Sequence, residues 1–191
     1  MKDNQAVQPQ RLVILGSTGS IGTSTLDVVA RHPERFVVAG LSAMQRIDDL
    51  IAQCQRWQPR WAVVPDEARA RVVRQALAER GVATDVLSGA QALCDMAAHP
   101  EVDSVMAAIV GAAGLPPCLA AAQAGKRLLL ANKEALVVGG ALFMRAVRED
   151  KVWQLAFPVR AAVIVGVDTT DRSTFLWREW PVVSYFVLSG V

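Results

Sequence analysis

The chain has 191 residues, of which 52 % are hydrophobic and 20 % are charged. This composition excludes a wholly disordered chain and provides enough apolar side chains for one ordinary domain, or one domain plus an extension. The 20 Lys and Arg nearly balance the 18 Asp and Glu. That balance argues against a dedicated nucleic-acid binder, because such proteins usually carry a clustered basic excess.

The sequence also bears on cellular location. Cys54, Cys94 and Cys118 are far apart and form no CxxC pair, which indicates a reducing compartment. With only two histidines, no zinc site can be assembled from spacing. The N-terminus is polar, without the apolar core of a signal peptide, and no uncharged apolar stretch of about 18 residues is present to cross a membrane. We expect a soluble cytoplasmic protein with no membrane or nucleic-acid partner and a disordered N-terminus at residues 1–9.

From residue 10 to residue 149, short apolar runs alternate with amphipathic stretches of about ten to fifteen residues. The expected strands are 11–15, 36–41, 61–64, 84–87, 104–110 and 127–131. The expected helices are 20–31, 47–57, 67–80, 90–99, 115–124 and 134–149. Such alternation is typical of βαβ units, and right-handed crossovers place helices on both faces of a parallel sheet. The sequence predicts an α/β, Rossmann-like, doubly wound parallel sheet over 10–149, with strand 11–15 in its interior.

The composition changes near residue 150. Residues 151–191 contain seven of the eleven aromatic residues, so we treat 150–191 as a separate C-terminal tail. Two apolar runs, Ala161–Val167 and Val182–Leu188, could be strands. Such strands could complete a sheet edge, aggregate, or pair with another chain, which leaves a homo-oligomer open.

A glycine-rich turn follows the first expected strand. Its sequence, Gly16-Ser-Thr-Gly-Ser-Ile-Gly22, has the GxxGxxG spacing and lies between a strand and a helix. Glycines there permit a tight turn, close approach of a pyrophosphate and close packing of the helix, whose N-terminus attracts an anion. The hydroxyls of Ser17, Thr18 and Ser20 could add donors. The turn predicts dinucleotide binding; an ordinary glycine turn is the alternative.

The end of the second expected strand bears on which dinucleotide binds. NAD sites usually place an acid about twenty residues after the glycine turn, to bind the ribose 2′-hydroxyl. Here no acid occurs before Asp48, and Arg46 could pair with a 2′-phosphate instead. This favours NADP; the alternative is a solvated arginine at the start of the next helix.

A third polar group lies in an otherwise apolar stretch. Asn132, Lys133 and Glu134 follow a strand and open a helix, which places them at the carboxyl edge of the sheet, where ligands bind in such folds. Glu134 could simply complement the helix dipole, but Lys133 gains nothing from it. An anionic ligand would account for the lysine.

Three segments together resemble one enzyme family. They are Leu15–Gly22 with Ser24–Val29, Met106–Leu115, and Gly125-Lys126 leading to Leu130–Ala135. In content, order and spacing they are similar to the N-terminal NADPH-binding domain of 1-deoxy-D-xylulose 5-phosphate reductoisomerase, from about Gln10 to Glu149. That resemblance implies an NADPH-dependent oxidoreductase of isoprenoid-precursor synthesis, in the methylerythritol phosphate pathway. It acts on a phosphorylated sugar with a divalent metal, magnesium or manganese, as Lewis acid.

The resemblance also implies roles for individual residues. Thr18, Gly19, Ser20 and Ile21 would hold the cofactor phosphates and ribose. Met44, Gln45 and Arg46 occupy the 2′-phosphate loop, where Arg46 could supply the charge. Asn132 and Glu134 would contact NADPH near its reactive end. Lys133 would contact the substrate.

The sequence departs from the family after Glu149. The family continues into a strand that ends in an Asp-Ser-Glu-His motif, which supplies the metal ligands; no such motif occurs here. Asp168 and Asp171 have the wrong spacing and context to replace it. We therefore expect a truncated form that carries no catalytic residues and no metal ligands. The alternatives are an inactive NADP-binding fragment and a non-enzymatic interaction protein.

Overall fold

The computed structural model describes residues 8–131 and 155–156. Its strands are β1 (Gln10–Leu15), β2 (Phe36–Ser42), β3 (Trp61–Val64), β4 (Asp85–Ser88), β5 (Ser104–Ala107), β6 (Arg127–Leu130) and β7 (Leu155–Ala156). Its helices are α1 (Ser20–Arg31), α2 (Ile47–Trp57), α3 (Glu67–Glu79), α4 (Gly89–Ala98) and α5 (Leu115–Gln123), with a short 3-10 turn, η1, at Ala112–Gly114.

The described strands form one parallel sheet in the order β4-β3-β2-β1-β5-β6-β7. Strand β1 lies in the interior, paired with β2 on one side and β5 on the other. The strand order therefore reverses between β1 and β5. In open α/β sheets, ligands bind in the crevice outside the carboxyl ends of the strands at such a switch point.

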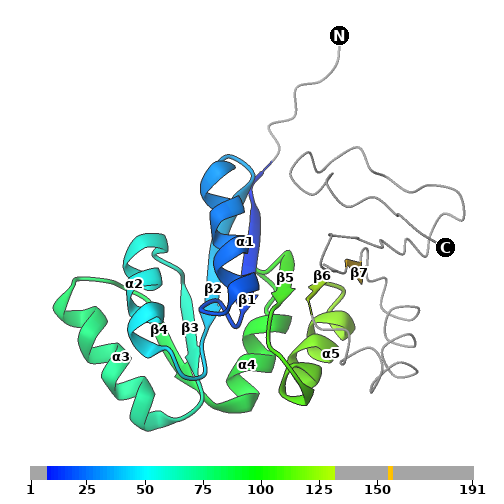
Figure 1. Cartoon of the computed structure of the whole chain (residues 1–191). Helices are drawn as coiled ribbons and strands as arrows, with labels where there is room; N and C mark the ends of the chain where they lie inside the picture. The colour runs from blue at the N-terminus through cyan, green and yellow to red at the C-terminus, as the bar shows by residue number, and fades with distance from the viewer. Residues whose placement is uncertain (1–7, 132–154, 157–191) are drawn as a thin grey trace, which may run out of the picture.

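Helices cover both faces of the sheet (Figure 1). Alternate residues of β1 point to opposite faces: Leu12 and Ile14 pack with α1, α2 and α3, while Val13 and Leu15 pack with α4 and α5. Burial on both faces explains why the strands are continuous apolar runs rather than alternating ones. The doubly wound fold predicted from the sequence is thus confirmed.

Most element bounds agree with the sequence-based expectation to within one residue, but two differ. The strand expected over 104–110 ends at Ala107, because the chain then turns to pack against the loop after β1. Strand β7, which lies within 150–191 and pairs with β6, was not predicted. The helix expected over 134–149 lies outside the described residues, as do the runs at 161–167 and 182–188.

Among the described helices, none has the length and apolar character needed to cross a membrane. The cytoplasmic location stays a prediction.

Candidate functional site

The turn between β1 and α1 is packed so tightly that two of its glycines are required. Gly16 has φ +79°, and a Cβ there would lie 2.9 Å from the carbonyl oxygen of Ala108. At Gly22, a Cβ would lie 2.4 Å from the carbonyl oxygen of Gly16. The turn is therefore pressed between the start of α1 and the segment after β5, at the switch point of the sheet.

Gly19 has a different role, since its φ of −74° is open to any residue. It is the N-cap of α1, and no side chain caps the helix there. The first turn of α1 also lacks an acidic residue. In contrast, α3 has both: the Asp66 carboxylate accepts a hydrogen bond from the Arg69 amide at 2.9 Å, and Glu67 lies in the first turn. The amides at the start of α1 are thus left for an anion.

Side-chain hydrogen bonds fix the turn to its neighbours. The Gly16 amide donates to the Ser42 hydroxyl (3.0 Å), and the Ser17 amide donates to the Ser42 carbonyl (2.8 Å). The Ser17 hydroxyl donates to Gln53 Oε1 (2.6 Å), while Gln53 Nε2 donates to the Ser17 carbonyl (3.0 Å). Ser17 is fully buried. Its hydroxyl therefore serves the fold, and the suggestion that it could bind a ligand is wrong.

Of the four residues after Ser17, Thr18 and Gly19 lie in the turn, and Ser20 and Ile21 begin α1. Thr18 is buried, and its hydroxyl makes no hydrogen bond within residues 8–131. Gly19 is half-buried, while Ser20 and Ile21 are exposed. Ile21 is an apolar side chain left open to solvent at the N-terminus of α1. The cofactor roles of these four residues stay predictions.

A cleft of about 220 Å³ adjoins the turn at the carboxyl edge of the sheet. Its lining comes from the ends of β1, β2 and β3, the start of α4 and the segment after β5, and it includes Gly16, Ala43, Met44, Pro65, Gly89 and Ile109. These residues offer mainly apolar surface and backbone. A flat apolar ring system would fit such a lining better than a charged group.

Arg46 is the N-cap residue of α2. Its side chain does not cap the helix; it is 61 % exposed and lies 3.7 Å from the Asp49 carboxylate, measured from Nη1 to Oδ2. Met44, two residues earlier, lines the cleft. This geometry is compatible with both interpretations of Arg46: a solvated arginine at the start of a helix, and a cation beside a ligand site.

Asn132, Lys133 and Glu134 lie outside the described residues, so their roles stay predictions. The residue before them, Ala131, donates its amide to the Ala107 carbonyl at 3.1 Å. The chain therefore leaves β6 at the carboxyl edge of the sheet, beside the end of β5.

Sequence reasoning missed three features of this site. The first is Ser42, whose hydroxyl orients the glycine turn. The second is Gln53, which is an ordinary polar residue in the pattern of an amphipathic helix. The third is the apolar cleft, which is assembled from separate loops. Only the serine at the end of a buried strand offered a signal, because a lone polar residue there needs a hydrogen-bond partner.

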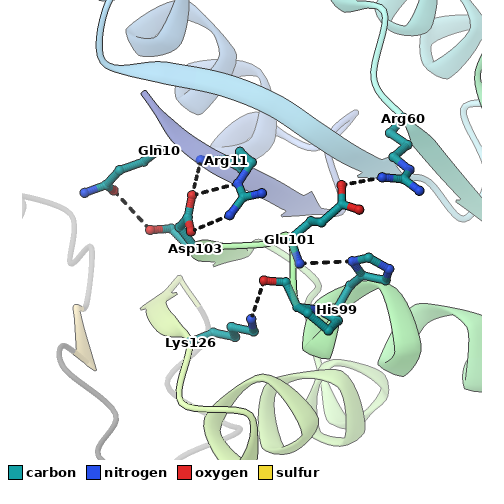
Figure 2. A network of polar contacts seen from close by, with 9 residues as sticks. Gln10, Arg11, Arg60, His99, Glu101, Asp103 and Lys126 are labelled. Atoms are coloured by element: carbon teal, nitrogen blue, oxygen red, sulfur yellow. Dashed lines mark hydrogen bonds and ion pairs between the residues drawn. The ribbon is translucent and has the colours of Figure 1, made fainter. Parts of the chain in front are cut away.

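The amino edge of the sheet carries a different polar network (Figure 2). Arg11 forms a bidentate pair with Asp103 at 3.2 Å, and the Arg11 amide also donates to this carboxylate at 2.8 Å. Arg60 pairs with Glu101, and Lys126 donates to the Pro100 carbonyl at 3.4 Å. This network joins the start of β1 to the loops that precede β3, β5 and β6.

The arginines lower the pKa of both carboxylates. Burial would raise the pKa of Asp103, but hydrogen bonds and charge from Arg11 outweigh it and lower this pKa. The hydrogen bond from Arg60 lowers the pKa of Glu101. Both acids are therefore occupied in ion pairs.

The described residues offer no donor set for a metal. Nowhere in 8–131 do three or more His, Cys, Asp or Glu side chains gather closely enough to hold an ion.

Comparisons with known proteins identify relatives. The family described as 1-deoxy-D-xylulose 5-phosphate reductoisomerase matches residues 12–140. The reductoisomerase of Stutzerimonas stutzeri is 53 % identical over 168 residues, which cover 88 % of this chain and 40 % of that protein. The enzyme of Pseudomonas putida is 55 % identical over 166 residues, with coverage of 87 % and 39 %. The chain thus spans about 40 % of the length of these curated relatives.

Solved structures agree. A crystal structure of a reductoisomerase in complex with magnesium superposes with a TM-score of 0.76 at 39 % identity, covering 80 % of this chain and 38 % of that one. The Zymomonas mobilis enzyme in complex with NADPH gives a TM-score of 0.74 at 40 % identity, covering 80 % of this chain and 39 % of that one. The fold, the glycine turn and these similarities lead to one conclusion: the chain belongs to the 1-deoxy-D-xylulose 5-phosphate reductoisomerase family.

Proposed function

We propose that this chain binds NADPH at the carboxyl edge of its sheet. The observation that carries the proposal is the uncapped N-terminus of α1, held against β2 and β5 by a turn that only glycine can form at Gly16 and Gly22. The pyrophosphate would accept hydrogen bonds from the free amides of this helix start. The apolar cleft lined by Met44 and Pro65 would receive the adenine ring.

Arg46 would select NADPH over NADH. The 2′-phosphate would replace the exposed Asp49 carboxylate as the partner of the guanidinium, which costs little because an exposed ion pair contributes only about 0.2–1 kcal/mol. Thr18, Gly19, Ser20 and Ile21 would surround the phosphates and ribose. Asn132 and Glu134 would contact the cofactor near its nicotinamide.

The reaction that we propose for the whole enzyme is the rearrangement and reduction of 1-deoxy-D-xylulose 5-phosphate to 2-C-methyl-D-erythritol 4-phosphate. NADPH, when bound, supplies the hydride for the reduction. Lys133 would contact the substrate, whose phosphate is an anion. The same family includes structures with the small molecule fosmidomycin, NADPH and magnesium, which supports a small-molecule ligand.

A second candidate is NADPH binding without catalysis. It is favoured by the lack of an Asp-Ser-Glu-His motif in the sequence and of a metal-ligand cluster within 8–131. An NADPH-oxidation assay with the chain, the substrate and manganese separates the two candidates. We expect cofactor binding without turnover. Substrate-dependent oxidation that is lost on Asp168→Ala would instead show that the tail supplies a metal ligand.

The binding proposal is tested with Arg46→Ala. Dissociation constants for NADPH and NADH are measured by nicotinamide fluorescence at one fixed ionic strength. A charge-assisted hydrogen bond to phosphate contributes about 1.5–3 kcal/mol, so NADPH binding should weaken roughly ten-fold or more. NADH binding should hardly change. Equal losses for the two cofactors would refute the role of Arg46.

A further inference from the structure

The glycine turn and helix α2 are joined by a reciprocal pair of hydrogen bonds. Ser17 donates its hydroxyl to the Gln53 side chain (2.6 Å) and accepts from the same side chain at its carbonyl (3.0 Å). Both polar atoms of the Gln53 amide are thus used on one residue. Ser17 is fully buried and Gln53 is half-buried, so the pair belongs to the packing between the turn and α2. The pair fixes the distance and the angle between the turn and α2.

The same helix carries Arg46 at its N-cap, seven residues before Gln53. Seven residues make nearly two turns of an α-helix, so these two positions lie on one face, about 10 Å apart along the axis. Gln53 therefore faces the turn from the same side on which Arg46 begins the helix. A shift or rotation of α2 at Gln53 would move Arg46 by a similar amount.

We propose that Gln53 is a positioning residue for cofactor specificity: it sets the distance between the pyrophosphate-binding turn and the arginine that selects the 2′-phosphate. This rests on the proposed NADPH function. NADPH has to satisfy the turn and Arg46 at the same time, whereas NADH has to satisfy only the turn. Loss of the Gln53 contacts should therefore weaken NADPH binding more than NADH binding.

The direct test replaces Gln53 by methionine, which keeps the length of the side chain and removes both hydrogen bonds. The matched control is Gln55→Met, the same substitution at an exposed position of the same helix. NADPH and NADH dissociation constants are measured on the full chain, with thermal unfolding alongside. Two lost hydrogen bonds should lower the preference for NADPH about five- to ten-fold, and the control should leave the preference unchanged.

A double-mutant cycle separates positioning from simple destabilisation. In the Arg46→Ala background, Gln53→Met should change the cofactor preference less than about two-fold, because the phosphate contact that it positions is already gone. If Gln53→Met fails to fold, Ser17→Ala replaces it. This variant keeps the hydrogen bond from Gln53 to the Ser17 carbonyl but removes the hydroxyl, and with it the bonds to Gln53 and to the Ser42 carbonyl, and it should show a smaller loss in the same direction.

The outcomes are distinct. Equal weakening of both cofactors by Gln53→Met, or full additivity with Arg46→Ala, would overturn the positioning role while leaving NADPH binding in place. A wild-type chain that binds no NADPH would overturn both this inference and the proposed function.

Discussion

At the carboxyl edge of the sheet, side chains such as Ser42 and Gln53 bond to the backbone of a turn, whereas at the amino edge charged side chains bond to one another. The first arrangement fixes a loop and leaves its helix amides free. The second satisfies its charges internally, as in the Arg11–Asp103 pair. Polar side chains thus hold a turn in place at one edge and pair with one another at the other.

The apolar residues support the same distinction. Ile21, Met44 and Val110 are exposed large hydrophobic side chains at the carboxyl edge; Ile21 lies in the first turn of α1, and the other two lie in loops. Val110 is 86 % exposed. An edge that combines free amides with exposed apolar groups suits a ligand that has both phosphates and rings. Three substitutions test this contrast, in order of decreasing effect.

The largest effect is expected from Gly22→Ala. Alanine normally favours a helix over glycine by about 1 kcal/mol, but here its Cβ would lie 2.4 Å from the Gly16 carbonyl oxygen. We expect the free energy of unfolding to fall by about 2–3 kcal/mol, as for an overpacked core, and NADPH binding to weaken about ten-fold or more. Urea denaturation and fluorescence titration measure the two quantities.

The control for this variant is Ser24→Ala, two residues later on the exposed side of α1. It should change the free energy of unfolding by no more than about 0.5 kcal/mol. A Gly22→Ala protein as stable as the wild type would show that the turn is not packed as described.

At the amino edge, Asp103→Asn should lower stability without affecting the cofactor. Because the folded pKa of Asp103 lies below its unfolded value, the stabilisation is present above about pH 4 and is lost as the pH falls through the folded pKa. We expect a loss of about 1 kcal/mol at pH 7 that shrinks steadily as the pH falls below about 4, with high salt reducing the difference. Denaturation across this pH range provides the measurement.

NADPH affinity supplies the second readout for Asp103→Asn. It should stay within two-fold of the wild-type value. A marked loss of NADPH affinity would remove the distinction between the two edges.

The smallest effect is expected from Met44→Ser. Met44 is 53 % exposed and lines the cleft, so its loss should leave stability within about 0.5 kcal/mol of the wild type. It should weaken NADPH binding by roughly two- to five-fold, since part of an apolar contact worth about 0.5–1 kcal/mol is lost.

Val72→Ser is the matched control, because Val72 is 56 % exposed on α3 and does not line the cleft. The two variants should have the same free energy of unfolding. Similar NADPH affinities for the two variants would exclude the cleft as the ring site.

The parts of the fold that depend on periodicity were predictable from the sequence. The spans of α1, α2 and β3 agree with the expected bounds. The two helices have a clear amphipathic pattern, the strand is a continuous apolar run, and each is followed by residues that end it. The end of β5 was not predictable: residues 108–110 are apolar like the strand before them. Hydrophobicity alone does not distinguish a buried strand from an exposed loop, as exposed Val110 shows.

Those parts of the candidate site that are formed by one continuous segment of the chain were predictable. The glycine turn follows directly from its spacing between a strand and a helix. The partners of Ser17 were not predictable, since its hydroxyl could face a ligand or a neighbouring helix, and only the packing of α2 decides between them. The boundary near residue 150 also stays a prediction, with β7 paired to the sheet beyond it.

NADPH binding at the carboxyl edge is tested by the amide chemical shifts of the ¹⁵N-labelled chain, recorded during an NADPH titration. We expect the largest shifts in 16–22 and 42–46. Amides beside Arg11, Asp103 and Lys126 should hardly move. Shifts concentrated at those amino-edge residues, or none at 16–22, would contradict NADPH binding at the carboxyl edge.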